Sequence, residues 1–145
     1  MSRALSIAVL GLLWAGCTKH QTEMILVITT DEPSALTDAY AFTKLLNRAD
    51  STRLPLVLVN VALSEGEAQK TFDALAATAR AFLKCAPDYL GGVPRDPKAN
   101  DAVRRQCHLL TLYPQAPASR AIEGIARALH DRMPQQPSPV LRASM

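Results

Sequence analysis

The chain has 145 residues, 48% hydrophobic and 20% charged, a composition typical of one folded domain rather than of a disordered tail. Its net charge of +3 neither requires nor excludes a nucleic-acid or membrane partner. The three cysteines form no CxxC pair, which argues against a disulfide framework. Cys107 and His108 are adjacent but lack the second ligand pair of a structural zinc site, so we assign no metal site.

Residues 1–21 are predicted to be a signal-like or spurious N-terminal segment. Arg3 precedes an apolar run at residues 4–14, which is too short to span a bilayer. The small residues before Cys17 are typical of a bacterial lipoprotein, in which this cysteine would be acylated. The bulky Trp14 departs from that pattern, and a misplaced start or a frame shift is the alternative.

A strand and a helix follow, joined by a short polar loop. The strand is the apolar run at residues 24–28, and residues 29–31 of the loop can cap the helix. A buried strand that enters a helix in this way is half of a βαβ unit, in which ligands bind at the carboxyl ends of the strands. Residues 29–33 are therefore expected at the functional edge of the sheet. The apolar side of the helix consists of Leu36, Ala39, Tyr40, Phe42 and Leu46.

The second predicted strand, residues 55–61, is an unbroken apolar run except for Asn60. Continuous apolarity indicates a strand with both faces buried, as in a parallel sheet covered by helices. A polar side chain near the end of such a strand needs a partner. The amide of Asn60 offers both a donor and an acceptor, which suits the edge of a purine base. The alternative is a structural hydrogen bond that fixes the neighbouring loop.

Ser64 and Glu67 form the capping box of a second helix. The apolar side of this helix consists of Ala68, Phe72, Leu75, Ala76, Ala79, Phe82 and Leu83. A third strand is predicted at residues 89–94, where Gly91 and Gly92 allow close backbone approach. These glycines are not a phosphate loop, because no Gly-Lys-Ser/Thr follows them.

The C-terminal part of the chain is predicted to contain two more helices. Asp96 is a candidate N-cap for a helix at residues 98–106, and Ser119 opens the last helix. The three prolines of residues 133–145 predict a disordered tail. The fold class is therefore α/β, a partial doubly wound parallel sheet of three strands with flanking helices. Three such strands leave exposed, flat apolar edges that favour association, so we expect that a part of the domain is missing.

Residues 22–132 contain four stretches of note: ILVITTDEPSALTDAYAFTKLL, LVLVNVALSEGEAQKTFDAL, YLGGVPRDPKANDAVRRQ and YPQAPASRAIEGIARAL. Together these stretches resemble the MinD/ParA family of P-loop ATPases, closest to the flagellar number and placement regulators (FlhG, FleN, YlxH). The segment DEPSALTDAYA is the piece most specific to that branch. The resemblance implies the C-terminal half of a P-loop NTPase fold that binds ATP with Mg²⁺, dimerises and regulates flagellar number and placement.

By the same resemblance, Asn60 contacts adenine, and the loop with Pro94, Arg95 and Asp96 covers the base. No catalytic residue is assigned, because the 145 residues contain no Walker A loop and no switch aspartates. We therefore expect this chain alone to bind ATP weakly or not at all and not to hydrolyse it.

The resemblance also implies a homodimer, flagellar assembly or regulatory proteins as partners, and a cytoplasmic location with possible attachment to the inner membrane. A DNA-binding role would have to use Arg104, Arg105, Arg120 and Arg127, and the mild net charge argues against it. The alternative function is a lipoprotein, anchored through Cys17, that carries a repurposed α/β domain.

Overall fold

The computed structural model describes residues 24–133, in which strands and helices alternate. The elements are β1 (Leu26–Thr29), α1 (Pro33–Ala49), β2 (Leu56–Ala62), α2 (Glu65–Leu83), β3 (Asp88–Pro94), α3 (Pro97–Arg104), α4 (Leu109–Leu112) and α5 (Pro117–Arg132). The three strands are parallel, in the order β1-β2-β3. The predicted fold class is thus confirmed. Residues 1–21, with Cys17, and residues 134–145 of the predicted tail lie outside the described residues.

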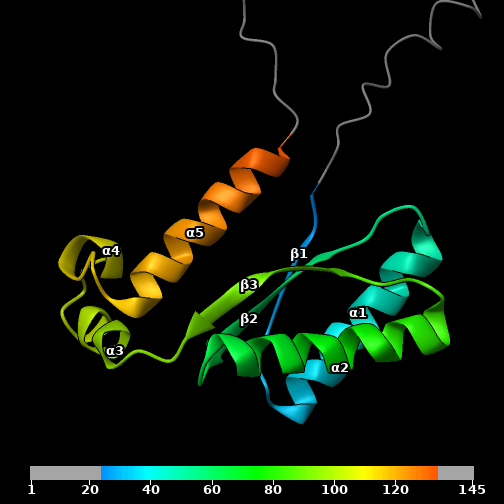
Figure 1. Ribbon diagram of the computed structural model, residues 1–145, viewed down its shortest axis with the longest axis horizontal. Coiled ribbons are helices and arrows are strands. Elements are labelled where there is room, and N and C mark those ends of the chain that lie inside the picture. Colours follow the sequence, from blue (N-terminus) through cyan, green and yellow to red (C-terminus); the bar gives the residue numbers. More distant parts are fainter. Residues whose placement is uncertain (1–23, 134–145) are drawn as a thin grey trace, which may run out of the picture.

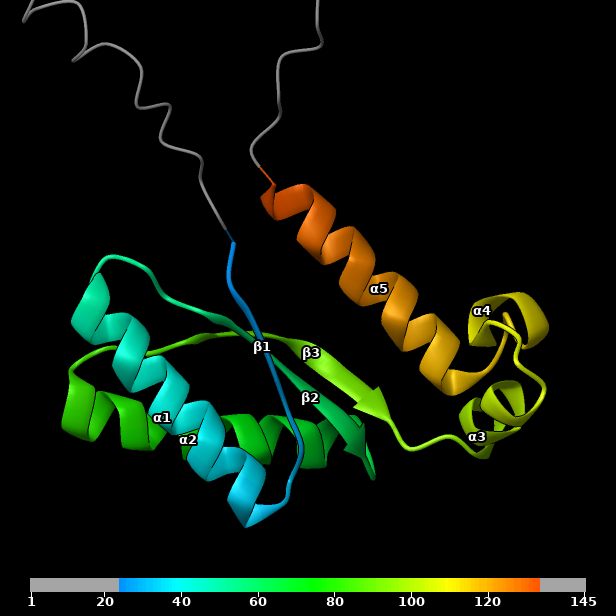
Figure 2. The ribbon, with the colours of Figure 1, turned by 180° about the vertical axis from the view of Figure 1, so that it is seen from behind.

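The helices form two layers around the sheet. Figure 1 shows α1 and α2 on one face and α5 on the other, with α3 and α4 beyond the carboxyl ends of β2 and β3. Figure 2 shows the same arrangement from behind, with β1 in front of β2. Within residues 24–133, no helix has the length and apolarity needed to cross a bilayer.

The central strand β2 explains the unbroken apolar run of the sequence. Val57 and Val59 are fully buried against α1 and α2, and Leu58 is buried on the opposite face, against α5. Both faces of β2 are covered, and both of its edges are hydrogen-bonded. β2 therefore has a neighbour on each side, and the predicted open edge is not found at this strand.

The edge strand β1 differs from β2 because its burial alternates. Val27 and Thr29 are buried under α1, whereas Leu26 and Ile28 are exposed. Among residues 24–133, β1 pairs with β2 alone, so its other edge is open. The predicted apolar edge is therefore located at β1.

Capping follows the prediction at α2 but not at α1. The Ser64 hydroxyl accepts a hydrogen bond from the Glu67 amide, at 3.2 Å. At α1, the N-cap residue is Glu32, and its side chain makes no capping bond. The prediction that residues 29–31 supply a capping oxygen is therefore wrong. The Thr30 hydroxyl accepts a hydrogen bond from the amide of Glu32 at 3.4 Å, but Glu32 is itself the N-cap residue, so this amide precedes the first turn of the helix.

Two phenylalanines predicted to be inward are exposed. Phe42 on α1 is 47% exposed and Phe82 on α2 is 75% exposed. By helix periodicity Phe42 lies about 160° around α1 from Tyr40, which lines the hollow between α1 and α2, and Phe82 lies in the last turn of its helix. Periodicity identified the apolar sides of these helices but not which of their residues are buried.

The two glycines of β3 bring helices close to the sheet on both faces. A Cβ on Gly92 would lie 2.5 Å from the Cβ of Ala68 on α2. Gly91 has a φ of +149°, and a Cβ there would lie 3.1 Å from Cγ1 of Ile125 on α5. The expectation of close backbone approach is confirmed at both positions.

Candidate functional site

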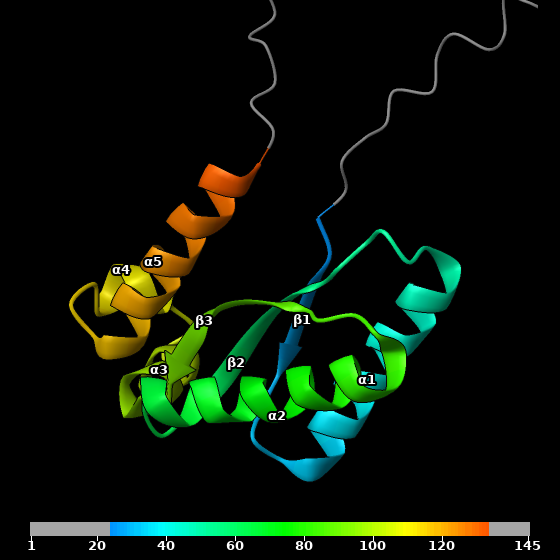
Figure 3. The same ribbon diagram turned by 45° about the vertical axis from the view of Figure 1, so that its right-hand side comes forward.

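A hollow of about 360 Å³ lies at the carboxyl ends of β2 and β3. Figure 3 shows how α3, α4 and α5 gather around this end of the sheet. The volume falls within the range of roughly 300–1,000 Å³ that is usual for small-molecule sites. Its lining residues are Asn60, Val61, Val93, Pro94, Arg95, Asp96, Ala99, Asn100, Leu109, Ala118 and Ile122.

All four residues predicted to contact a nucleotide base line this hollow, which we call the β2–β3 pocket. Asn60 comes from the end of β2, and Pro94, Arg95 and Asp96 come from the end of β3 and the turn after it. They meet because β2 and β3 are neighbours, with Ala62 opposite Pro94 in the register. Residues 29–33, also expected at the functional edge, are not part of the lining.

The side-chain amide of Asn60 is half-buried and forms no hydrogen bond to any residue within 24–133. The alternative considered for Asn60, a structural hydrogen bond to the neighbouring loop, is therefore not found in the described part of the chain. Both the donor and the acceptor of the amide remain available at the wall of the pocket. Such an amide can donate a hydrogen bond to a ligand and accept another from it.

Val61, the next residue, has a backbone conformation that sequence reasoning missed. Its φ is +58°, in the left-handed region, where a β-branched residue is a genuine outlier. The β2–β3 pairing is irregular between Val59 and Ala62, and the backbone N–H of Arg95 then donates to the carbonyl of Ala62 at 2.8 Å. Asn60 and Val61 lie within this irregular stretch, and both line the pocket. Strain of this kind costs about 1–3 kcal/mol and is typical of ligand sites.

Asp96 connects the two helices that form the far wall of the pocket. One carboxylate oxygen accepts a hydrogen bond from the Lys98 amide at 2.9 Å, which confirms the predicted N-cap of α3. The other oxygen accepts from the Ala118 amide at 3.2 Å, in the first turn of α5. No sequence pattern predicts this second bond, because its partners are 22 residues apart. Asp96 therefore fixes the shape of the pocket.

A polar network holds α3 against α4 next to the pocket. The Asp101 carboxylate accepts hydrogen bonds from the Tyr113 hydroxyl and, at 2.8 Å, from Nε of Arg105. The hydrogen bond from Tyr113, followed by that from Arg105, holds the pKa of Asp101 below its ordinary value. The same bond raises the pKa of Tyr113, whose ring lies 5.4 Å from Nζ of Lys98.

The arginines considered for DNA binding are partly used within the fold. Arg105 is paired with Asp101, and Arg127 lies 3.5 Å from the Glu123 carboxylate. No group of three or more His, Cys, Asp or Glu side chains that could hold a metal ion occurs in the part of the chain that the structure describes.

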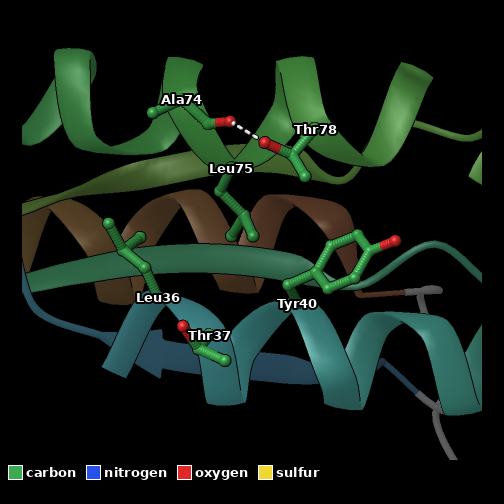
Figure 4. A pocket seen from close by; sticks show the side chains of 6 residues that line it. All are labelled: Leu36, Thr37, Tyr40, Ala74, Leu75 and Thr78. Atoms are coloured by element: carbon green, nitrogen blue, oxygen red, sulfur yellow. Dashed lines mark hydrogen bonds between the residues drawn. The ribbon is translucent and has the colours of Figure 1, made fainter. Parts of the chain in front are cut away.

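A second hollow, of about 230 Å³, lies between α1 and α2. Figure 4 shows Leu36 and Tyr40 of α1 facing Leu75 of α2 across it. The hydroxyls of Thr37 and Thr78 donate to the carbonyls one turn earlier on their own helices, at 2.8 and 2.9 Å. This hollow is apolar and smaller than usual ligand sites, and it offers no recognition chemistry comparable to that of the β2–β3 pocket.

Three comparisons with known proteins bear on this geometry. No family model matches the chain. The antiactivator FleN of Pseudomonas aeruginosa PAO1 is 36% identical over 103 residues, which are 71% of this chain and 37% of FleN. The structure of the MinD cell division protein of Aquifex aeolicus superposes with a TM-score of 0.54 at 24% identity, over 77% of this chain and 46% of MinD.

The match to FleN establishes a relationship in sequence, and the match to MinD shows a common fold. In both matches this chain spans less than half of the relative's length. The similarity thus covers only a part of each relative.

Proposed function

Because the chain is a relative of the MinD/ParA ATPases and corresponds to the C-terminal half of their fold, we propose that its β2–β3 pocket binds the adenine base of ATP. The observation that carries this proposal is the amide of Asn60, which lines the pocket without a hydrogen-bond partner among residues 24–133. The remaining part of the domain would hold the phosphates and Mg²⁺.

The lining of the pocket fits a flat heterocycle. Val93, Pro94 and Ile122 supply apolar contacts for the faces of a base, and Asn60 supplies one donor and one acceptor for its edge. Arg95 is exposed at the rim, where its guanidinium can stack over an aromatic ring. These groups recognise a base but provide no stabilisation of phosphoryl transfer.

At the level of the whole domain, we propose that the chain contributes to an ATP-dependent regulator of the same kind as FleN, whose name describes it as an antiactivator. Homodimerisation and contacts with flagellar regulatory proteins belong to this proposal, as does peripheral attachment to the inner membrane. None of the six glycines of the chain is followed by Lys-Ser/Thr, so we expect the chain alone to release no phosphate from ATP.

The test is a chimera in which residues 24–133 of this chain replace the matched stretch of P. aeruginosa FleN. We expect the chimera to bind ATP in calorimetry and to bind it more tightly than CTP. Replacement Asn60→Ala removes the contacts to the base edge and should weaken ATP binding about 5- to 150-fold, equivalent to roughly 1–3 kcal/mol. Discrimination between ATP and CTP should fall by a similar factor.

Asn47→Ala is the matched control, because Asn47 lies on α1 outside the pocket and its amide donates to the carbonyl of Leu83. This variant should leave ATP affinity unchanged. Equal ATP affinity of the chimera and its folded Asn60→Ala variant would assign Asn60 a structural role and refute base binding by the pocket.

A further inference from the structure

The β2–β3 pocket has a second side-chain amide, which Asn100 contributes from the first half of α3. This amide forms no hydrogen bond to any residue within 24–133, so its donor and its acceptor are both unused in the described part of the chain. Asn100 is exposed, whereas Asn60 is half-buried. The two amides therefore lie at different depths of the pocket, with Asn100 nearer to the solvent.

The lining changes in character between the floor and the mouth of the pocket. Val93 and Ala118 are buried and form an apolar floor. The exposed members of the lining are Val61, Arg95 and Asn100, which therefore form the mouth. A nucleotide whose base packs on the apolar floor directs its sugar and phosphates towards this mouth, because burial of polar groups without hydrogen-bond partners is unfavourable.

Of the groups of a bound nucleotide, the sugar best fits the position of Asn100. Arg95 is the only cation among the described residues that line the pocket, so the pocket does not enclose the phosphates. The sugar connects the base to the phosphates and therefore lies at the mouth. Asp96 is another acceptor in the lining, but each of its carboxylate oxygens already accepts a hydrogen bond, from the amides of Lys98 and Ala118. At the mouth, Arg95 can only donate, whereas Asn100 can donate and accept.

We propose that Asn100 binds the ribose of the nucleotide through the two hydroxyls of the sugar. Its Oδ1 accepts a hydrogen bond from one hydroxyl, and its Nδ2 donates to the other. A site that hydrogen-bonds a hydroxyl rejects the analogue that lacks it, because a polar group of the site is then left unpaired. Asn100 is therefore a specificity residue that selects ribonucleotides over deoxyribonucleotides. The inference rests on the proposed base binding, which holds the sugar at the mouth.

The two amides then have separate tasks. Asn60 recognises the base and sets the preference between adenine and cytosine, and Asn100 recognises the sugar and sets the preference between ribose and deoxyribose. An amide that is merely solvated on the exposed side of α3 would influence neither preference. An amide that contacts the base would influence the first preference alone. Separate variation of the base and the sugar distinguishes these cases.

The experiment titrates the full, isotope-labelled 145-residue chain with nucleosides, which need no phosphate-binding groups. The ligands are adenosine, cytidine and the two deoxyadenosines that lack one or the other hydroxyl. Nuclear magnetic resonance detects millimolar dissociation constants and observes the side-chain amides of Asn60 and Asn100 separately. We expect adenosine to shift both side-chain signals and to bind more tightly than cytidine. Adenosine should also bind about 2- to 12-fold more tightly than either deoxyadenosine, which corresponds to one neutral hydrogen bond.

Substitutions separate the two preferences. Asn100→Ala should remove the preference for adenosine over the deoxyadenosines and keep the preference for adenosine over cytidine, and Asn60→Ala should do the reverse. Asn100→Asp keeps acceptors for the ribose hydroxyls and should retain the preference for adenosine over the deoxyadenosines. Arg104→Ala is the matched control and should leave every affinity unchanged, because Arg104 is exposed on the same helix but does not line the pocket.

The outcomes separate the role of Asn100 from base binding. Equal binding of adenosine and the deoxyadenosines, with adenosine still preferred over cytidine, would overturn the role of Asn100 and leave base binding intact. A preference for ribose that persists in Asn100→Ala would overturn the role of Asn100 as well. Equal binding of adenosine and cytidine would refute base recognition, and with it the inference. Absence of binding by every nucleoside would overturn both.

Discussion

Replacement of Gly92 by alanine tests how closely β3 approaches α2. The added Cβ would lie 2.5 Å from the Cβ of Ala68 and 2.9 Å from Oε2 of Glu65. The Glu65 carboxylate can rotate away, but Ala68 is fully buried in its helix and can move only with α2. Overpacking of this kind costs about 1–3 kcal/mol, and we expect Gly92→Ala to lower the free energy of unfolding by that amount.

The contact can be isolated by a double-mutant cycle with Ala68→Gly. Alone, Ala68→Gly should destabilise by about 1 kcal/mol, because glycine is a poor helix former. In the Gly92→Ala background it removes the clashing methyl group, so the two losses should be non-additive, with a coupling of at least about 1 kcal/mol. Gly124→Ala is the control: a Cβ on Gly124 of α5 meets no atom within 4 Å, and alanine should stabilise by about 0.5–1 kcal/mol.

The assay is urea unfolding of the full chain followed by circular dichroism, with each variant compared at constant m-value. Two results together would refute the close β3–α2 contact. Gly92→Ala would lower the free energy of unfolding by less than about 0.5 kcal/mol, and the loss in the double variant would equal the sum of the losses from Gly92→Ala and Ala68→Gly.

Two further predictions concern the walls of the pocket. Asp96→Ala should lower the free energy of unfolding by about 1–3 kcal/mol, because it removes the acceptors for the Lys98 and Ala118 amides. Asp96→Asn keeps one good acceptor and should lower the free energy of unfolding by less. Equal losses for the two variants in urea unfolding would contradict this prediction. Tyr113→Phe should raise the pKa of Asp101 towards its ordinary value in a carboxyl NMR titration. Since the folded-state pKa of Asp101 is lowered, its stabilising effect is present above the ordinary value and is lost as the pH falls through the folded-state pKa. An unchanged titration of Asp101 in the Tyr113→Phe variant would contradict the assigned cause.

The features predicted correctly from the sequence depend on local rules. The apolar run of β2 predicts burial on both faces, and the amphipathic spacing of α2 predicts Phe72 and Leu75 in the core. Ser64 and Asp96 act as N-caps because an oxygen acceptor stands next to free helical amides. Each of these interactions connects residues a few positions apart, so the sequence displays it directly.

The features that were missed depend on distant parts of the fold. Phe42 has the spacing of a core residue, but its side chain is 47% exposed. The short helix α4 lies in a stretch for which no helix was predicted, and it is held by the contact of Tyr113 with Asp101, which sequence spacing does not reveal. Asn60 is indicated by its position in an apolar strand, whereas its neighbours Pro94 and Arg95 were selected through the resemblance.

The end of β2 is where local preference and observed conformation disagree most. Val61 is a strong strand former, yet its φ of +58° is one that valine adopts at a cost of about 1–3 kcal/mol. Asn60 and Val61 lie within the irregular stretch of the β2–β3 pairing and line the pocket, and the Arg95 amide closes the ladder at Ala62. Conflicts between the local preference of a residue and its observed conformation concentrate at functional sites. The strain at Val61 is therefore an argument for the pocket that is independent of the resemblance to any family.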